Sequence, residues 1–557
     1  MTDCLVCAGR ILTVLGIATF AFMSSGCGGE NAGERSGLRV EGTEPGDCED
    51  DADNDADGLF DCADPGCAGS SVCNVGGDAG MGGHGGPGGN DGAGGNGGNP
   101  DGGGGAAGTG LGGTGGTPMC DPVAQTGCED GRVCEEVVAG EPACFAALVL
   151  RGNVFDQSGG GGIQGATVVA LDAGCVPAST VAVTDVGGDY QIQLIRRRDA
   201  DGNPVGGDVT LRADAAGFQT FPAGVRQPLP IDVSSPVEGD GVLVVQTAAT
   251  DISLIALPSG AGTNQIFGSV EVPNDSTGVL VVAETSGQSV QGFTAIADRD
   301  GVYRIFNLPD GDFSVLGYAQ GANYGVQAAS VSGGQEARVD LAITGDAPGT
   351  VTGSVQIVNP GAGEGTSYIL VVESTFDETL ARGETPPGLR APDGSELVDS
   401  GSWMIEGVPA GSYKVLGAFE NDRLVRDPDF GQGNTEIVRV DVTAGQSVEA
   451  PSFKITGSLD VLSPGAEGAE EVDGTPVFSW VDDSGEDRYH ILVFDTFGEM
   501  IWSDPNIPGS SGSDPEVPYG GPPLESGMFY QFRVTSFDAN DRPLLRTEDL
   551  KGVFFLP

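Results

Sequence analysis

The chain from Leu148 to its end is built from short hydrophobic runs. Many of these runs are rich in Val, Ile, Thr or aromatic residues, and Gly, Asp, Asn and Pro separate one run from the next. This spacing is typical of strands joined by tight turns, whereas the periodicity of an amphipathic helix is nearly absent. We therefore expect an all-β fold, a string of about four β-sandwich domains.

Two segments of this region repeat one another without a gap. Residues 301–317 (GVYRIFNLPDGDFSVLG) and 401–417 (GSWMIEGVPAGSYKVLG) match at a constant offset of 100. Each predicts a strand, a turn that contains Pro, and a second strand. A looser copy at residues 151–192 lacks the Leu-Pro-x-Gly turn. The second complete unit carries extra residues, which we place in a loop around Phe376–Glu396.

The three copies resemble the carboxypeptidase regulatory-like family over about residues 148–456. The recurring text of that family is a G-x-V opening, a T-D-x-x-G-x-Y strand entry and an L-P-x-G-x-Y-x-V turn and strand, and each copy matches part of it. The resemblance implies transthyretin-like, seven-stranded β-sandwiches, a fold also similar to starch-binding domains. In this alignment Tyr190, Tyr303 and Trp403 share one position, which we expect to be buried.

The last hundred residues have a different pattern. The elements P-x-F-x-W, at residues 476–480, and L-x-x-G-x-x-Y-x-F-R-V, at residues 524–534, resemble a fibronectin type III domain. Trp480 and Tyr530 are then expected to anchor its core.

The N-terminus predicts export. Residues 11–23 are apolar, too few to span a bilayer as a helix but suited to the central region of a secretory signal. The small residues before Cys27 resemble the lipobox of bacterial lipoproteins, in which the cysteine is lipidated, and Gly28 favours the outer membrane. The alternative is an ordinary secretory signal that leaves Cys27 as a thiol or in a disulfide.

A glycine-rich stretch follows at residues 76–117. Gly fills 24 of these 42 positions, without the strict Gly-X-Y period of collagen. It cannot form a hydrophobic core, so we expect a disordered spacer of roughly 32–39 Å r.m.s. reach.

The cysteines form two clusters of four on either side of this stretch, while Cys175 stands alone as an expected small buried side chain. In an exported chain, even clusters predict disulfide-stapled modules, each with three possible pairings. Zinc is the competing interpretation, although neither cluster has paired C-x₂-C spacing or a His. Short modules of this kind also resemble those of myxobacteria-like surface proteins. The disulfide candidates are Cys48, Cys62, Cys67 and Cys73, then Cys120, Cys128, Cys134 and Cys144.

An acidic loop inside the first cluster has the spacing of a calcium site. Counted from Asp53, acids occupy positions 1, 3, 5, 9 and 12, with Gly58 at position 6, as in an EF-hand-type loop. The loop resembles those of dockerins and thrombospondin type 3 repeats, and Ca²⁺ is the one cofactor we predict. The alternative is a solvated acidic turn. The candidate ligands are Asp53, Asp55, Asp57, Leu59, Asp61 and Asp64.

Charge and missing motifs narrow the function. With 25 Lys+Arg against 80 Asp+Glu, the net charge of −55 opposes binding to nucleic acid. His84 is followed by Gly-Gly-Pro and His490 by Ile-Leu-Val, so neither begins the His-x-x-Glu pair of zinc carboxypeptidases. We expect no enzymatic activity, although the 80 acids leave chance carboxylate pairs open.

These features predict a lipid-anchored outer-membrane protein, on the cell-surface or periplasmic face, that uses its sandwiches for adhesion or protein interaction. The alternatives are a carbohydrate-binding protein and a purely structural spacer. The partner is then an unidentified protein or polysaccharide at the cell surface. The expected organisation is a signal peptide (1–26), a linker (27–47), the acidic module (48–73), the glycine-rich tether (76–117), a second cysteine module (118–145), three regulatory-like sandwiches (146–257, 265–345 and 350–456) and the fibronectin-like sandwich (457–557).

Overall fold

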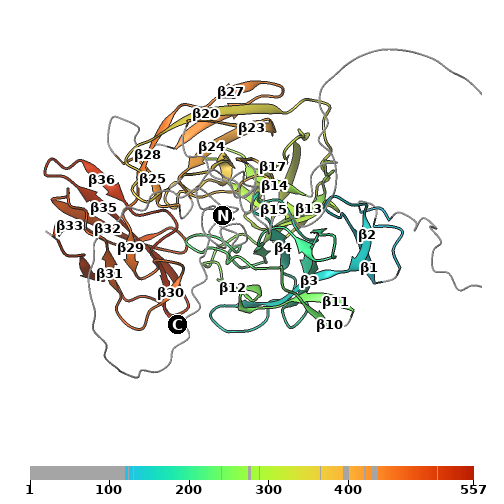
Figure 1. Ribbon diagram of the computed structural model, residues 1–557, viewed down its shortest axis with the longest axis horizontal. Coiled ribbons are helices and arrows are strands. Elements are labelled where there is room, and N and C mark those ends of the chain that lie inside the picture. The colour runs from blue at the N-terminus through green and yellow to red at the C-terminus, as the bar shows by residue number, and fades with distance from the viewer. Residues whose placement is uncertain are drawn as a thin grey trace, which may run out of the picture. The chain divides into compact units, whose positions relative to one another are not determined.

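The β-rich part of the chain is the part that the structure describes. The computed structural model describes residues 120–557, apart from 123–124, 130, 240, 274–277, 288, 364, 393–400, 420–421, 429–436 and 511. Almost all regular structure in it is β (Figure 1), which confirms the predicted fold class. Two single turns of 3-10 helix, η3 (Ala248–Thr250) and η4 (Glu373–Thr375), interrupt the strands.

A small antiparallel hairpin precedes the first sandwich. It pairs β1 (Arg132–Glu135) with β2 (Ala143–Ala146), and Cys134 lies opposite Cys144.

The first sandwich consists of two sheets. One has the order β10-β11-β3-β12, with β6 also paired to β3, and the other has the order β5-β4-β9; β7 and β8 form a separate hairpin. The strands are β3 (Leu148–Asp156), β4 (Thr167–Leu171), β5 (Ala182–Val183), β6 (Asp189–Gln193), β7 (Arg197–Arg198), β8 (Pro204–Val205), β9 (Thr210–Asp214), β10 (Val237–Gly239), β11 (Val242–Val245) and β12 (Ile252–Leu254).

The second sandwich has seven strands, as the family resemblance implies. Its sheets have the orders β16-β13-β19 and β15-β14-β17-β18. The strands are β13 (Asn264–Ser269), β14 (Val279–Thr285), β15 (Gly292–Ala297), β16 (Val302–Leu308), β17 (Gly311–Tyr318), β18 (Gln327–Val331) and β19 (Glu336–Arg338).

The third sandwich repeats this arrangement and adds two strands. In place of the three- and four-stranded sheets it has β23-β20-β28-β25, with β27 also on β20, and β22-β21-β24-β26. The strands are β20 (Gly349–Ile357), β21 (Tyr368–Val372), β22 (Arg390–Ala391), β23 (Gly401–Val408), β24 (Gly411–Gly417), β25 (Leu424–Arg426), β26 (Val438–Val442), β27 (Ser447–Glu449) and β28 (Phe453–Gly457).

A parallel pair between the first strand of each sandwich and one of its last strands is common to all three. These pairs are β3 with β12, β13 with β19, and β20 with β27. The looser first copy therefore has the same topology at its centre as the two closely matching repeats.

The shared aromatic position is buried in every copy. Tyr190, Tyr303 and Trp403 are 5%, 3% and 4% exposed, which confirms the expectation. Each ring lies opposite a glycine of the neighbouring strand: Gly152, Gly268 and Gly353 respectively.

Strands β4 and β14 are buried on both faces. Val168 and Val281 point into the cores of their own sandwiches, whereas their neighbours Val169 and Val282 join a cluster that includes the core of the third sandwich around Tyr368. All described residues fall within one contact unit of the chain, so these are contacts inside that unit.

The fourth sandwich packs two sheets around Trp480, which is fully buried with its ring 5.2 Å from that of Tyr489. Trp480 and Tyr530 are both core residues, as predicted. The sheets have the orders β29-β31-β34 and β30-β37-β35-β32-β33, with β36 also on β35. The strands are β29 (Val461–Ser463), β30 (Glu470–Glu471), β31 (Val477–Trp480), β32 (Arg488–Asp495), β33 (Met500–Pro508), β34 (Glu516–Pro518), β35 (Phe529–Phe537), β36 (Pro543–Arg546) and β37 (Val553–Phe555).

Candidate functional site

Three predicted features lie outside the described residues and stay predictions. They are the lipidation residue Cys27, the candidate calcium loop Asp53–Asp64 and the first cysteine cluster, Cys48 to Cys73.

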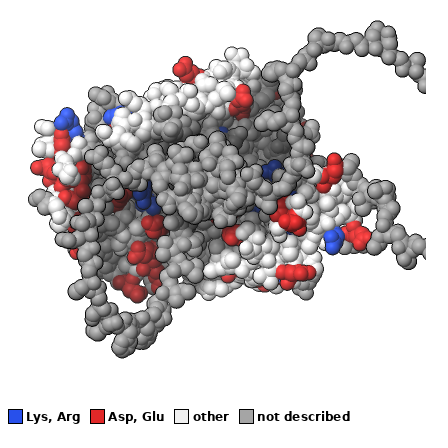
Figure 2. All heavy atoms as spheres, viewed as in Figure 1, with Lys and Arg blue, Asp and Glu red and all other residues white. Residues whose placement is uncertain are grey.

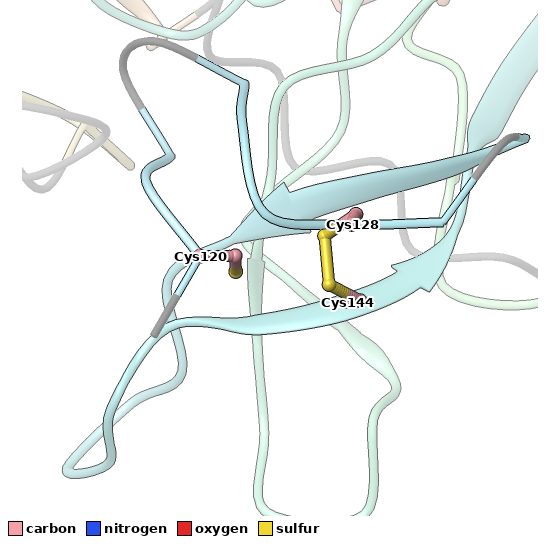
Figure 3. Close-up of side chains that lie close together, drawn as sticks. All are labelled: Cys120, Cys128 and Cys144. Atoms are coloured by element: carbon pink, nitrogen blue, oxygen red, sulfur yellow. A yellow bond between two sulfur atoms is a disulfide. The ribbon is translucent and has the colours of Figure 1, made fainter. Parts of the chain in front are cut away.

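The second cysteine cluster forms two disulfides. Cys120 bonds to Cys134 and Cys128 bonds to Cys144, which selects one interleaved pairing from the three that the sequence allows. In Figure 3 the Cys128–Cys144 bond joins the loop before β1 to strand β2. The region therefore has the stapled module that the cysteine count predicts.

Disulfide bonding also bears on the zinc interpretation. Within the described ranges, Cys120, Cys128 and Cys144 are the only group of three or more His, Cys, Asp or Glu side chains close enough to share an ion. All three sulfurs are committed to disulfides, whereas a zinc ligand must be a thiolate. The geometry favours disulfides over zinc.

The cysteine module is docked on the first sandwich by Arg198. Its guanidinium group is fully buried, forms an ion pair with Glu135 of β1 and donates to the carbonyl oxygen of Ala146 at 3.1 Å. The same group lies over the ring of Phe145, 5.2 Å from its centroid. If the module left the sandwich, one of the two charges would lose its buried partner, which is strongly unfavourable. The ion pair therefore stabilises the contact between the cysteine module and the first sandwich.

One Ser–His hydrogen bond occurs in the fourth sandwich. His490 Nε2 lies 2.9 Å from Ser503 Oγ, across the pair β32–β33. Burial and the nearby Arg488 lower the pKa of His490. Among the described residues no hydrogen bond joins a carboxylate to the other ring nitrogen of His490.

The described domains have no aromatic residue among their exposed large hydrophobic side chains, which a stacked sugar would need. The exposed large hydrophobic residues of these domains are Val, Leu and Met, with no aromatic among them. Trp502 is partly buried against the core of the fourth sandwich. It stacks on Phe478 at 6.1 Å and meets Tyr519 edge-on at 5.3 Å.

One loop of the third sandwich contacts the first, the second and the fourth sandwich. Residues 376–389 lie between η4 and β22, where the extra residues of the second repeat were expected. Leu380 packs with Val225 of the first sandwich and Phe529 of the fourth. The carbonyl oxygen of Pro387 accepts from the backbone N–H of Gln320 in the second sandwich at 3.2 Å. We call residues 376–389 the junction loop.

A buried ion pair joins the junction loop to the first sandwich. Glu384 Oε1 accepts from Arg212 Nη1 at 2.6 Å and from the Thr294 hydroxyl of the second sandwich at 2.9 Å. Arg212 also forms a two-point contact with Asp214, at 2.9 and 3.1 Å. Burial alone would raise the pKa of Glu384, but the charge and the hydrogen bond of Arg212 together with the hydrogen bond from Thr294 lower it overall, so the glutamate stays ionised.

A second charged cluster joins the junction loop to the fourth sandwich. Arg382 donates to the carbonyl oxygens of Gly224, at 2.5 Å, and of Asp549, at 3.3 Å. The Asp549 carboxylate accepts from Arg426 at 3.1 Å and from Arg546 at 3.3 Å. Burial would raise the pKa of Asp549, yet the surrounding guanidinium groups bring it down to about 2.

Sequence patterns had not singled out these residues. Arg212, Arg382, Glu384 and Asp549 belong to no recognisable motif, because their roles depend on contacts between distant parts of the chain. The only available signal was the surplus of residues in the second repeat, which located the loop without its partners.

The charge excess lies largely on the surface. Figure 2 shows many more acidic than basic side chains on the visible face of the described residues. Several Arg are instead buried in the contacts above, among them Arg198, Arg212, Arg382 and Arg426.

Comparisons with known proteins identify no family for this chain. No protein-family model matches it, and no curated protein matches it. Among solved structures, the Bacillus anthracis TIE protein is 12% identical, with 70% of this chain and 68% of that chain covered and a TM-score of 0.14. The minor pilin GBS52 of Streptococcus agalactiae is 13% identical (36% and 100% covered, TM-score 0.16), and the major pilin subunit BcpA of Bacillus cereus is 11% identical (56% and 99% covered, TM-score 0.15).

None of the helical turns in the described residues has the length and apolar character needed to cross a bilayer.

Proposed function

We propose that this protein is a non-enzymatic lipoprotein of the outer membrane that presents its β-sandwiches outside the cytoplasm for adhesion or protein interaction. The observation that carries the proposal is the pair of disulfides immediately before the first sandwich. Structural disulfides persist in oxidising compartments and are rare in the cytosol. They agree with the export signal at residues 11–23 and with the lipobox-like sequence that ends at Cys27.

The buried aromatic residues favour protein contact over sugar binding. Carbohydrate sites in β-sandwiches need an exposed ring on which a sugar can stack, and the described domains hold Trp403, Trp480 and Trp502 in or against their cores. Carbohydrate binding stays as the second candidate because the regulatory-like repeats resemble starch-binding folds. A spacer without a partner of its own is the third.

Protease shaving of intact cells tests the location. If the sandwiches are displayed at the surface, an added protease should release a fragment that begins within residues 76–117. Full protection of the chain on intact cells, with cleavage after the outer membrane is opened, would place the sandwiches on the periplasmic face. Recovery in the cytosolic fraction would contradict the proposal.

A cysteine variant tests the anchor. Cys27→Ser should abolish incorporation of a labelled fatty acid and release the protein from the membrane fraction, whereas Cys175→Ala, at a buried position, should change neither. Incorporation that survives Cys27→Ser would refute lipidation at this residue.

Binding assays separate the three candidate roles. Adhesion predicts that cells lacking the gene lose attachment, and that the full chain restores it. Retention of the full chain on a polysaccharide resin would favour sugar binding, and unchanged attachment without the gene would favour the spacer.

Calcium binding is tested on the full chain. We expect Ca²⁺ titration to show one site that Asp53→Asn removes and Glu44→Gln, an equal change in charge outside the loop, leaves intact. No heat of binding at millimolar Ca²⁺ would refute the site.

A further inference from the structure

Two of the three related sandwiches carry one extra residue in the strand before the Pro turn. In the second sandwich, Ile266 pairs with Ile305 but Asn264 pairs with Leu308, so β16 bulges against β13. In the third sandwich, Thr350 pairs with Glu406 but Gly349 pairs with Val408.

The extra residues are Asn307 and Gly407, which lie at the constant offset of 100. Both have left-handed backbone conformations, with φ of 62° and 72°, that Asn and Gly adopt at low cost. The corresponding strand β6 of the first sandwich pairs with β3 without a shift in register. A bulge changes the direction in which the side chain or carbonyl group of its extra residue points.

Asn307 points at the first sandwich. Its Oδ1 accepts from the backbone N–H of Gly217 at 2.7 Å. Its Nδ2 donates to the carbonyl oxygens of Ala215 at 3.0 Å and Phe218 at 2.9 Å. One side chain thus satisfies three backbone groups of the turn after β9, in which Gly217 has φ of 81°.

Gly407 makes the corresponding contact with the second sandwich. Its carbonyl oxygen accepts from the backbone N–H of Gly321 at 2.7 Å, and the preceding carbonyl oxygen, of Glu406, accepts from Gln320 Nε2 at 3.0 Å. Gly321 has φ of 89°. A methyl group at Gly407 would lie 2.9 Å from the Gly321 nitrogen, so the close approach requires glycine.

The two contacts share their parts. In each, a left-handed glycine donates its N–H to an acceptor on the bulge residue of the next sandwich, and the glycine is the third residue after the end of β9 or β17. The turns read Ala215-Ala216-Gly217 and Ala319-Gln320-Gly321.

We propose that the bulge is a docking element that seats the second and the third sandwich each on the Ala-x-Gly turn of the sandwich before it. The partner it fits is a sandwich of the same class with a left-handed glycine at this turn. Among the described residues no such sandwich precedes the first one, which lacks both the bulge and the Leu-Pro turn. This docking within the chain depends neither on where the protein is located nor on what it binds.

Substitution of Asn307 in the full chain tests the docking element. Asn307→Gly keeps the left-handed backbone but removes three hydrogen bonds, so hydrogen–deuterium exchange in a peptide over residues 215–221 should rise roughly threefold or more. A protease should also cut the join at residues 257–263 faster. The matched control is Asn359→Gly, an exposed Asn with φ of 45° whose side chain is not at a contact between sandwiches.

A second variant guards against a general loss of folding. Asn307→Asp keeps the acceptor for Gly217 and loses the donor, so exchange in this peptide should lie between that of the unsubstituted protein and that of Asn307→Gly. In all variants exchange over residues 319–322, at the next junction, should not change. Unchanged exchange at residues 215–221 in Asn307→Gly, or an equal rise in Asn359→Gly, would overturn the proposal.

Discussion

At the scale of single residues, a glycine faces an aromatic ring on the neighbouring strand in every repeat. This pair explains the glycine of the G-x-V text and the aromatic residue of the G-x-Y text. In the second sandwich this glycine, Gly268 of β13, lies opposite Tyr303 on one neighbouring strand and is crowded by the backbone that follows the parallel strand β19. A Cβ atom on Gly268 would lie 1.7 Å from the carbonyl oxygen of Val339, and the Tyr303 hydroxyl donates to that same oxygen at 2.8 Å. In the first sandwich the Tyr190 hydroxyl donates to Thr250 in the same way, at 2.6 Å.

We predict that Gly268→Ala destabilises the protein strongly, by about 3 kcal/mol, because the backbone oxygen that it meets cannot move aside as a flexible side chain would. The control is Gly325→Ala in the same sandwich, where the nearest atoms lie 3.9 Å away. Denaturant unfolding followed by fluorescence measures both. Equal stability of the two variants would show that the close approach is relieved in solution.

At the scale of elements, the cysteine hairpin is too small to fold alone and depends on two kinds of support. The disulfides Cys120–Cys134 and Cys128–Cys144 restrict the conformations of the unfolded chain. Arg198 holds the hairpin on the first sandwich through its ion pair with Glu135. Burial raises the pKa of Glu135, and the contact with Arg198 offsets part of that effect.

We predict that replacing Cys120 and Cys134 together by Ser lowers the stability of the module by about 3 kcal/mol, as expected for a bridge across 14 residues. Hydrogen–deuterium exchange over β1 and β2 should rise, while exchange over the fourth sandwich stays unchanged. Peptide mapping without reductant checks the pairing first, and a Cys120–Cys128 bond would contradict the structure.

At the scale of the whole described molecule, buried charges lie between the sandwiches. The junction loop brings Glu384 to Arg212 and Arg382 to the backbone of the first and fourth sandwiches. Removing one partner from a buried pair leaves a desolvated charge behind, which costs far more than the loss of an exposed pair. The contacts between sandwiches should therefore respond to single charge changes.

We predict that Glu384→Gln costs about 3 kcal/mol of stability, because Arg212 keeps only Asp214 as an ionic partner. The control is Glu336→Gln, which removes the exposed pair with Arg304 and should cost no more than about 1 kcal/mol. Thermal unfolding by calorimetry compares them. A cost for Glu384→Gln no larger than that of the control would mean that the pair is not buried in solution.

The contact between the third and fourth sandwiches should depend on pH through Glu548. Burial raises the pKa of this carboxyl to about 7, although it accepts a hydrogen bond from the Arg423 backbone N–H at 2.6 Å. The fold favours the protonated form. The contribution of the protonated Glu548 carboxyl to the free energy of unfolding is therefore complete below about pH 4.5. It falls as the pH rises towards 7 and is absent above it.

We predict that Glu548→Gln removes this fall, which amounts to roughly 2–3 kcal/mol. The measurement is the denaturant midpoint from pH 5 to 8 in the two proteins. Glu525→Gln, at an exposed acid of the same sandwich, should leave the pH profile unchanged. Parallel profiles for the unsubstituted protein and Glu548→Gln would argue against a raised pKa.

Sequence alone was sufficient for the fold class, for the shared core position of Tyr190, Tyr303 and Trp403, and for the core role of Trp480. These follow from local patterns: a strand alternates its two faces, and a turn needs its Gly and Pro. The offset between the repeats changes from 85 at their openings, Gly268 and Gly353 (353 − 268), to 100 at Gly301 and Gly401, and this change located the junction loop, because an insertion between matched strands must lie in a loop that joins them.

Other features depend on residues that are far apart in sequence and were decided only by the tertiary structure. A sequence with four cysteines permits three pairings, and the fold selects one of them by bringing Cys128 to Cys144. Nothing local marks Arg212 as the partner of Glu384, since the two lie 172 residues apart. Nor does a pattern of strands show that Asn307 is an extra residue, because a bulge is defined by the register against its partner strand. The sequence by itself determined which elements form; the tertiary structure determined which of them meet, because only folding brings distant backbone and charged groups within hydrogen-bonding distance.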